Sequence, residues 1–198
     1  MNPSQHPPVE EAAAAPSGDA APAAAASGPS RRAGRRDKPE RGTRTGFSTG
    51  ACSAAAARAC ALGLVHGQVP ESVESLLANG QRVSFAIHDG HIEGEGLARV
   101  AHGYVQKFAG DDPDCTDGAH LTVDLRILPG QAGQVQFRAG PGVGTVTLPG
   151  LGLEIGGPAI NPVPRANITQ NLQEVAGPLL AEHGLEVTVS VPGGEVMA

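Results

Sequence analysis

Four aspartates crowd the seven positions from Asp111 to Asp117, in the segment Ala109-Gly-Asp-Asp-Pro-Asp-Cys-Thr-Asp-Gly118. Neighbouring carboxylates repel, so one of such a group can stay protonated at neutral pH and transfer protons. We therefore take Asp111 and Asp112 as candidate catalytic residues. Two alternatives stay open. The carboxylates could bind a hard cation, although the order of oxygen ligands does not fit the calcium loop, or they could bond to backbone N–H groups in a polar turn.

A second candidate segment is Thr45-Gly-Phe-Ser-Thr-Gly-Ala-Cys-Ser53, which places hydroxyls and glycines where a helix is expected to begin. The free N–H groups and positive dipole of a helix start suit a phosphate or a carboxylate. Thr49, Gly50 and Ser53 are therefore candidate substrate-binding residues. Ordinary capping of the helix by the same residues is the alternative.

Glycine is unusually dense between Arg138 and Gly157, with seven glycines in twenty residues. Glycine weakens helix and strand interiors, so this backbone must bend sharply or lie against a ligand. We take Gly142 and Gly144 as candidate binding residues. No Gly-Lys-Ser/Thr follows, which excludes a P-loop, and the glycine spacing does not fit a dinucleotide fingerprint.

Asn161-Pro-Val-Pro-Arg165 follows directly. Its prolines fix the backbone near an expected helix start, and a guanidinium held there suits the fork geometry of a carboxylate. Asn161 and Arg165 complete the set of candidate binding residues, although Arg165 could equally be a surface residue.

The remaining reactive side chains predict no protein-bound metal. The seven histidines form no HxxxH or HxH pair, and the three cysteines share no metal-ligand spacing. An odd cysteine count favours a reducing cytoplasm over an oxidising compartment. Cys52 and Cys60 fall in an Ala-rich stretch and are expected to be small core residues.

The helices and strands that must position these residues are predicted to form an α+β domain. Helices are expected from Gly50 to Val65, capped by Ser48 or Thr49 and ended by Gly67, and from Pro164 to His183, kinked at Gly177-Pro178. Asn79-Gly80 predicts a hairpin. Further strands are expected at 97–108, 121–128, 135–137, 143–148 and 185–191, without helical crossovers, which favours a mixed or mostly antiparallel sheet.

Composition divides the chain into a tail and one domain, 43–198. Residues 1–42 are mostly Ala, Pro, Ser, Gly, Arg and Glu, and are predicted to be disordered. The rest carries eight basic and fifteen acidic residues, a poor match for nucleic acid. No apolar run is long enough to span a membrane.

These motifs together resemble the cobalt-precorrin-5B C(1)-methyltransferase family of anaerobic cobalamin biosynthesis. The resemblance covers about residues 44 to 196 and rests on the segments beginning at Thr45, Ala109, Gly142, Pro158 and Leu185. It implies methyl transfer from S-adenosylmethionine to C-1 of cobalt-precorrin-5B, giving cobalt-precorrin-6A. The cobalt would be carried by this small-molecule substrate and not by the protein.

The resemblance also implies a fold like the second domain of ribosomal protein S5. Family members continue for roughly another domain, a Rossmann-like lobe expected to hold S-adenosylmethionine, and this sequence stops at Ala198. We therefore expect the N-terminal domain of such a methyltransferase. The alternative is a non-catalytic corrinoid-binding domain, and the oligomeric state is left open.

Overall fold

The computed structural model describes residues 46–111, 113–149 and 152–197. The predicted tail, residues 1–42, and Asp112 lie outside this part of the chain. The helices are α1 (Thr49–His66) and α2 (Pro162–Glu182), with short 3₁₀ turns η1 (Gly96–Ala98) and η2 (Gly194–Val196). The strands are β1 (Ser72–Leu76), β2 (Arg82–Ala86), β3 (His88–Glu93), β4 (Val100–Gln106), β5 (His120–Leu128), β6 (Val135–Ala139) and β7 (Gly184–Ser190).

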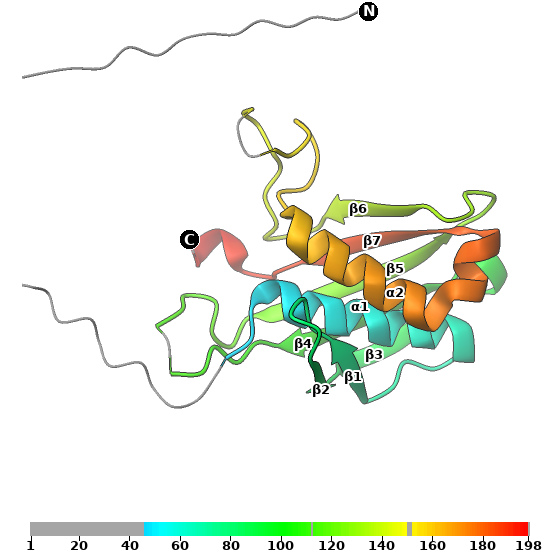
Figure 1. Ribbon diagram of the computed structural model, residues 1–198, viewed down its shortest axis with the longest axis horizontal. Coiled ribbons are helices and arrows are strands. Elements are labelled where there is room, and N and C mark those ends of the chain that lie inside the picture. The colour runs from blue at the N-terminus through cyan, green and yellow to red at the C-terminus, as the bar shows by residue number, and fades with distance from the viewer. Residues whose placement is uncertain (1–45, 112, 150–151, 198) are drawn as a thin grey trace, which may run out of the picture. The chain divides into compact units, whose positions relative to one another are not determined.

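Five strands form one mixed sheet in the order β3-β4-β5-β7-β6, and β1 and β2 form a separate antiparallel hairpin. Every neighbouring pair in the large sheet is antiparallel except β6 and β7. Both helices lie on the same face of this sheet (Figure 1). The predicted α+β class, with two main helices and a mixed sheet, is confirmed. The expectation that no helix joins consecutive strands is wrong at one place, because α2 connects the parallel strands β6 and β7.

Two strand predictions differ from the structure. Strand β3 was not expected, because its His, Asp, Gly and Glu residues are poor strand formers; it forms by pairing with β4 at the sheet edge. The expected strand at 143–148 is instead part of a loop, in which Thr145 makes an isolated bridge to Pro158. The backbone N–H of Val146 donates to Gly157 O at 2.9 Å, so this stretch pairs within its own loop and not with the sheet.

The helix ends follow the predicted signals. Ser48 caps α1 by accepting a hydrogen bond from Ala51 N, and Gly67 ends it in the left-handed conformation, with φ of 88°. Helix α2 begins two residues before the expected Pro164 and loses helical geometry at Ala176, just ahead of Pro178. Proline removes a helix hydrogen bond and crowds the preceding turn, which explains the kink. Neither of the two described helices combines the length and the apolar character that crossing a lipid bilayer requires.

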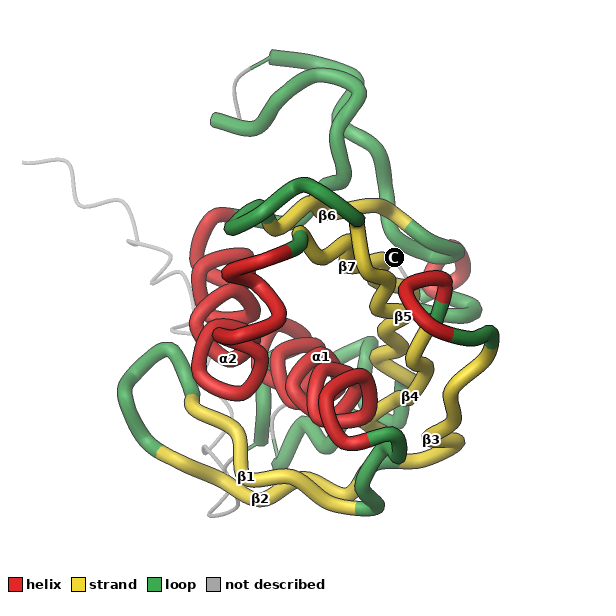
Figure 2. Tube along the Cα trace, turned by 90° about the vertical axis from the view of Figure 1, so that its right-hand side faces the viewer, coloured by secondary structure: helices red, strands yellow, loops and turns green. Residues whose placement is uncertain are grey.

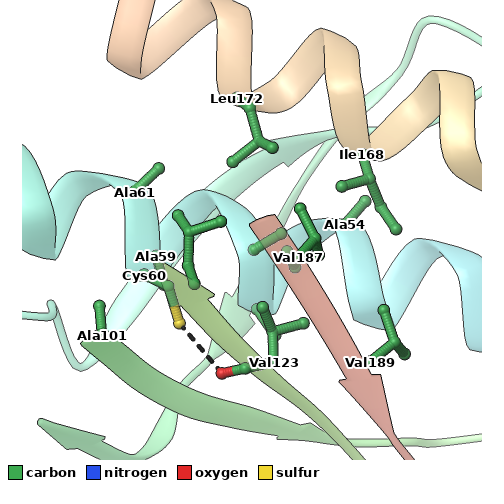
Figure 3. Close-up of a cluster of buried hydrophobic side chains, with 14 of the residues drawn as sticks. Ala54, Ala59, Cys60, Ala61, Ala101, Val123, Ile168, Leu172, Val187 and Val189 are labelled. Atoms are coloured by element: carbon green, nitrogen blue, oxygen red, sulfur yellow. Dashed lines mark hydrogen bonds between the residues drawn. The ribbon is translucent and has the colours of Figure 1, made fainter. Parts of the chain in front are cut away.

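Helix α1 is the centre of the core. It contacts β4 and β5 of the sheet, helix α2 and strand β1, so most of its circumference is covered (Figure 2). The residues that make this possible are small, and they are almost fully shielded from solvent: Cys52, Ala54, Ala55, Ala56, Ala57, Ala59, Cys60 and Ala61. Larger side chains from the neighbouring elements fill the space around them, among them Val123, Ile168, Leu172 and Val187 (Figure 3).

A buried polar network joins α2 to the hairpin. Asn171 is fully buried; its Oδ1 accepts from Ser75 Oγ and from Leu76 N, both at 3.1 Å, and its amide donates to Leu76 O at 2.9 Å. The Asn167 amide donates to the same carbonyl at 2.8 Å. Since buried polar groups are costly when unpaired, these bonds fix the register of α2 against β1.

We expect Ala57→Leu to destabilise the domain by about 1–3 kcal/mol, because Ala57 is fully buried and the added atoms have no space beside it. Thermal unfolding followed by circular dichroism measures the effect. Val65→Leu is the control, since Val65 lies on the same helix but is 44% exposed. Equal losses of Tm in the two variants would contradict the close packing of α1.

Candidate functional site

A cavity of about 250 Å³ lies where the starts of α1 and α2 meet the loop after β6. It collects three segments that are far apart in the sequence: residues 49–53, 142–144 and 159–168. Six of the seven predicted binding residues line it, namely Thr49, Gly50, Ser53, Gly142, Gly144 and Asn161. Among the described residues that line it there is no His, Cys, Asp or Glu side chain. It therefore offers neutral hydrogen-bonding groups and apolar surface, and no set of metal ligands.

Both helix starts open on this cavity and touch each other. A side chain placed on Gly50 would have its Cβ 3.0 Å from Pro164 Cγ, so glycine at this position lets the two helix starts meet. Asn161 is the N-cap residue of α2, but its side chain makes no capping hydrogen bond. Two positive dipole ends therefore face one space, which favours a bound anion. The start of α1 carries N–H groups there, whereas Pro162 and Pro164 in the first turn of α2 have none.

The two candidate glycines differ in their surroundings. Gly142 has φ of 75°, and a Cβ there would lie 1.8 Å from Val191 O, so only glycine lets the loop pass the chain that follows β7. The Val191 N–H also donates to Pro141 O at 2.8 Å. A Cβ on Gly144 would meet only Ala159 Cβ, at an ordinary 3.7 Å. Gly142 is thus required by the fold, whereas the protein itself would accept a methyl group at position 144.

Arg165, the seventh predicted binding residue, does not line this cavity. Its Nε and one terminal nitrogen donate to Ile160 O and Pro158 O, each at 2.8 Å. Its guanidinium lies over the Phe137 ring, 5.5 Å from the centroid. Arg165 therefore braces the stretch that leads into α2, and it borders a separate hollow of about 500 Å³ beside β6.

The aspartate segment is partly a structural turn. Asp114 pairs with Lys107, whose side chain is only 2% exposed, and accepts from Thr116 N at 2.8 Å. The buried Lys107 ammonium also donates to Thr116 Oγ1 at 2.6 Å. Hydrogen bonds from Lys107 and Thr116 hold the pKa of Asp114 far below its usual range. Asp117 accepts from Ala109 N at 2.8 Å. The polar-turn interpretation therefore holds for these two aspartates.

Asp111 lies at the exposed turn before that network. It lines neither the cavity at the helix starts nor the hollow beside β6. The segment is nevertheless tied to the start of α1, because Phe47 N donates to Phe108 O at 2.8 Å. A Cβ on Gly46 would lie 2.0 Å from the Ala109 carbonyl carbon, so the two chains touch through their backbones. The structure thus brings this motif beside the α1 motif.

A second, larger hollow of about 650 Å³ adjoins the first across the contact of Gly50 with Pro164. Its lining includes residues that the sequence did not indicate as functional, among them Phe47, Asn79, Val163 and Asn167. Asn79 was expected only as a hairpin residue, and Val163, which is 64% exposed, fell between two prolines ahead of the expected helix. Only the arrangement of the hairpin beside both helix starts brings them together.

The cysteines near this site are unsuited to nucleophilic chemistry. Burial raises the pKa of Cys52 to about 11 and raises that of Cys60 further. The Cys60 thiol also donates to Val123 O at 3.5 Å. Both thiols are neutral near pH 7, as expected for the small core residues predicted from the sequence.

Comparison with known proteins gives a consistent family assignment. The profile of the CbiD family matches residues 36–198. A cobalt-precorrin-5B C(1)-methyltransferase of Polaromonas sp. is 62% identical over 167 residues, 82% of this chain and 44% of the relative. The enzyme of the same name from Dechloromonas aromatica is 59% identical, over 80% of this chain and 40% of its own length. The chain therefore spans less than half the length of these relatives.

One solved structure supports the fold. The cobalamin biosynthesis protein cbiD from Archaeoglobus fulgidus superposes with a TM-score of 0.51 and 24% identity, over 78% of this chain and 45% of that one.

Asp114→Asn should lower the Tm at neutral pH, because it leaves the buried Lys107 ammonium without its counter-charge. A carboxyl whose pKa is lowered by folding stabilises the fold above its unfolded pKa of about 4, and this contribution is lost as the pH falls further. The difference in Tm between variant and wild type should therefore shrink in acid. Glu71→Gln, which removes an exposed carboxylate elsewhere, is the control. A Tm difference that does not change with pH would contradict the pairing of Asp114 with Lys107.

Proposed function

Because the chain belongs to the CbiD family, we propose that it binds the corrinoid substrate of cobalt-precorrin-5B C(1)-methyl transfer at the cavity between the helix starts. The relatives' names support the reaction, and the chemistry of the cavity supports the substrate class. A corrinoid precursor is a flat macrocycle with many carboxylate arms and an internal cobalt. The metal is part of this substrate, so the cavity needs no metal ligands of its own.

The meeting of two helix starts at one cavity is the observation that carries this proposal. A cavity of about 250 Å³ is below the range of about 300–1,000 Å³ in which proteins enclose whole drug-sized ligands. It suits one carboxylate arm, bound by N–H groups at the start of α1, the hydroxyls of Thr49 and Ser53 and the amide of Asn161. The apolar edge of the ring would then rest on the adjoining hollow, against Phe47 and Val163.

Gly144 and Arg165 contribute to the proposed substrate binding in different ways. Gly144 lets the ligand approach the loop backbone, since nothing in the protein itself requires a glycine there. Arg165 holds the carbonyls of Pro158 and Ile160 and thereby places Asn161. Its remaining N–H donors lie beside the hollow next to β6, where they can take a second carboxylate arm of the same substrate.

The methyl donor in this proposal is S-adenosylmethionine, bound mainly by the part of the relatives' length that this chain does not span. Acidic side chains commonly hold the hydroxyls of a nucleoside ribose. No acidic side chain is found among the described residues that line the two cavities at the helix starts. In the transfer, the bond between sulfur and methyl breaks as C-1 of the ring supplies the electron pair for the new bond, and positioning provides much of the rate.

Asp111 and Asp112 remain our candidates for moving a proton on the ring system as its electrons shift. Asp114 and Asp117 hold the turn itself together, so we do not assign them this role. We place the reaction in the cytoplasm, in keeping with the neutral thiols of Cys52 and Cys60, which form no disulfide.

Titration calorimetry on the 198-residue chain tests this function. We expect saturable binding of a polycarboxylate corrinoid and weak or no binding of S-adenosylmethionine. Micromolar binding of S-adenosylmethionine would move the donor site to the glycine-rich loop. Absence of corrinoid binding by a folded chain would contradict the proposed substrate site.

Gly144→Ala distinguishes a ligand site from a structural loop. The variant should keep the wild-type Tm, because the new methyl group meets Ala159 at an ordinary distance. It should weaken corrinoid binding by about tenfold or more, equivalent to about 1.4 kcal/mol. Gly177→Ala is the matched control, since a Cβ there meets nothing within 4 Å and lies away from the cavity. Unchanged affinity in Gly144→Ala would count against binding at this loop.

A further inference from the structure

Four of the seven histidines gather on the sheet face opposite α1. In β4, Ala101, Gly103 and Val105 are buried toward the helix, so His102 and Tyr104 point to the other face. Strand pairing sets His88 opposite Tyr104 and His91 opposite His102. The Tyr104 ring stacks on His120, with centroids 4.1 Å apart. This face therefore carries imidazole groups at close range, although their spacing in the sequence gave no metal-binding pattern.

Three of these outer-face groups converge. Asp89, His91 and His102 each offer a ligand atom, and the three atoms lie within 4.8 Å of one another. His102 Nε2 lies 3.7 Å from Asp89 Oδ2, and His91 Nδ1 lies 3.7 Å from Asp89 Oδ1. Zinc bonds of about 2.0–2.2 Å place tetrahedral ligands about 3.4 Å apart. The two distances to Asp89 exceed this by a few tenths of an ångström. To share one ion, the three ligand atoms, which lie within 4.8 Å, must draw together further, and His91 Nδ1 must give up its 2.9 Å contact with Asp89 O.

A fourth residue orients the central imidazole. Asp124 on β5 lies opposite His102, and its Oδ1 is 2.7 Å from His102 Nδ1. An N–H on Nδ1 donates to that carboxylate and leaves the lone pair of Nε2 directed at Asp89. Histidines that bind metals usually have this kind of partner on the other ring nitrogen, because it fixes the tautomer and raises the basicity of the ligand.

The backbone is distorted at Asp89, whose carboxylate is one of the three converging groups. The register of β3 against β4 shifts between His88 and His91. Among the residues that the structure describes, Asp89 is the one non-glycine residue with positive φ, at 53°. Such a conformation costs free energy, and bulges of this kind re-aim side chains beside functional sites. Here the bulge brings the Asp89 carboxylate to the two histidines.

We propose that Asp89, His91 and His102 bind a divalent first-row transition-metal ion of the Zn²⁺ class. Two imidazoles and one carboxylate suit such an ion better than the harder Mg²⁺ or Ca²⁺. Glu93 Oε1 lies 3.6 Å from the other ring nitrogen of His91, Nε2, where it can act as a hydrogen-bond partner of this imidazole and not as a ligand. The ion would join the bulged edge strand β3 to β4, on the face away from the corrinoid cavity. The site is independent of the proposed methyl transfer.

Titration of the metal-free chain with Zn²⁺ tests this site by calorimetry. We expect one saturable site in the wild type and its loss in His91→Ala and in His102→Ala. Asp124→Asn should weaken binding by about 10–100-fold, as for other partners of metal-binding histidines. His120→Ala is the control, because it removes an exposed imidazole from the same face outside the cluster. Equal affinity in His102→Ala and His120→Ala would overturn the proposal.

The histidine ring resonances provide a second readout that does not depend on a variant folding. Zn²⁺ added to the wild-type chain should shift the His91 and His102 signals and leave His120 unchanged. Shifts confined to other histidines, or an absence of shifts at saturating Zn²⁺, would also overturn the site.

Discussion

The small size of the side chains on α1 is the constraint on which the rest of the structure depends. Alanine and cysteine on nearly every side of this helix let the sheet, α2 and the hairpin approach it together. A helix with one apolar stripe would pack on one layer only. Because α1 is held from several sides, its first turn has a fixed place relative to α2. Gly50 is also small, and at the start of α1 it lets Pro164 of α2 come into contact with the helix.

The candidate site follows from that packing. Two helix starts held against each other direct their positive dipole ends toward one cavity, and the loop after β6 closes it. That loop is itself held at three places: by Gly142 against Val191, by the bridge from Thr145 to Pro158, and by Arg165. These contacts hold the loop in place, and Gly144 and Asn161 face the cavity. The Lys107–Asp114 pair plays the corresponding role in the aspartate turn.

Local signals predicted most of the fold, and they indicated six of the residues that the fold brings together at the candidate cavity. Ser48, Gly67, Asn79-Gly80 and Gly177-Pro178 act through short-range backbone chemistry, so the caps, the hairpin and the kink could be predicted. The pairing of strands that are distant in the sequence could not be predicted in this way. Strand β3 has a composition typical of a loop and forms only against β4, whereas residues 143–148 look like a strand and pair within their loop. Arg165 was expected to face a ligand, but part of its guanidinium donates to the carbonyls of Pro158 and Ile160. These carbonyls lie beside the guanidinium only because the chain folds back on itself, which local sequence signals do not show.

The central claim is that the meeting point of the two helix starts recognises a carboxylate-rich corrinoid. Amide resonances of the ¹⁵N-labelled chain, followed during titration with such a corrinoid, test it most directly because each N–H reports its own surroundings. The account predicts that the largest shifts fall on Gly50, Ser53, Gly144 and Asn161, with little change along β3 and β4. Saturable shifts centred on the outer sheet face, with the helix starts unaffected, would contradict it.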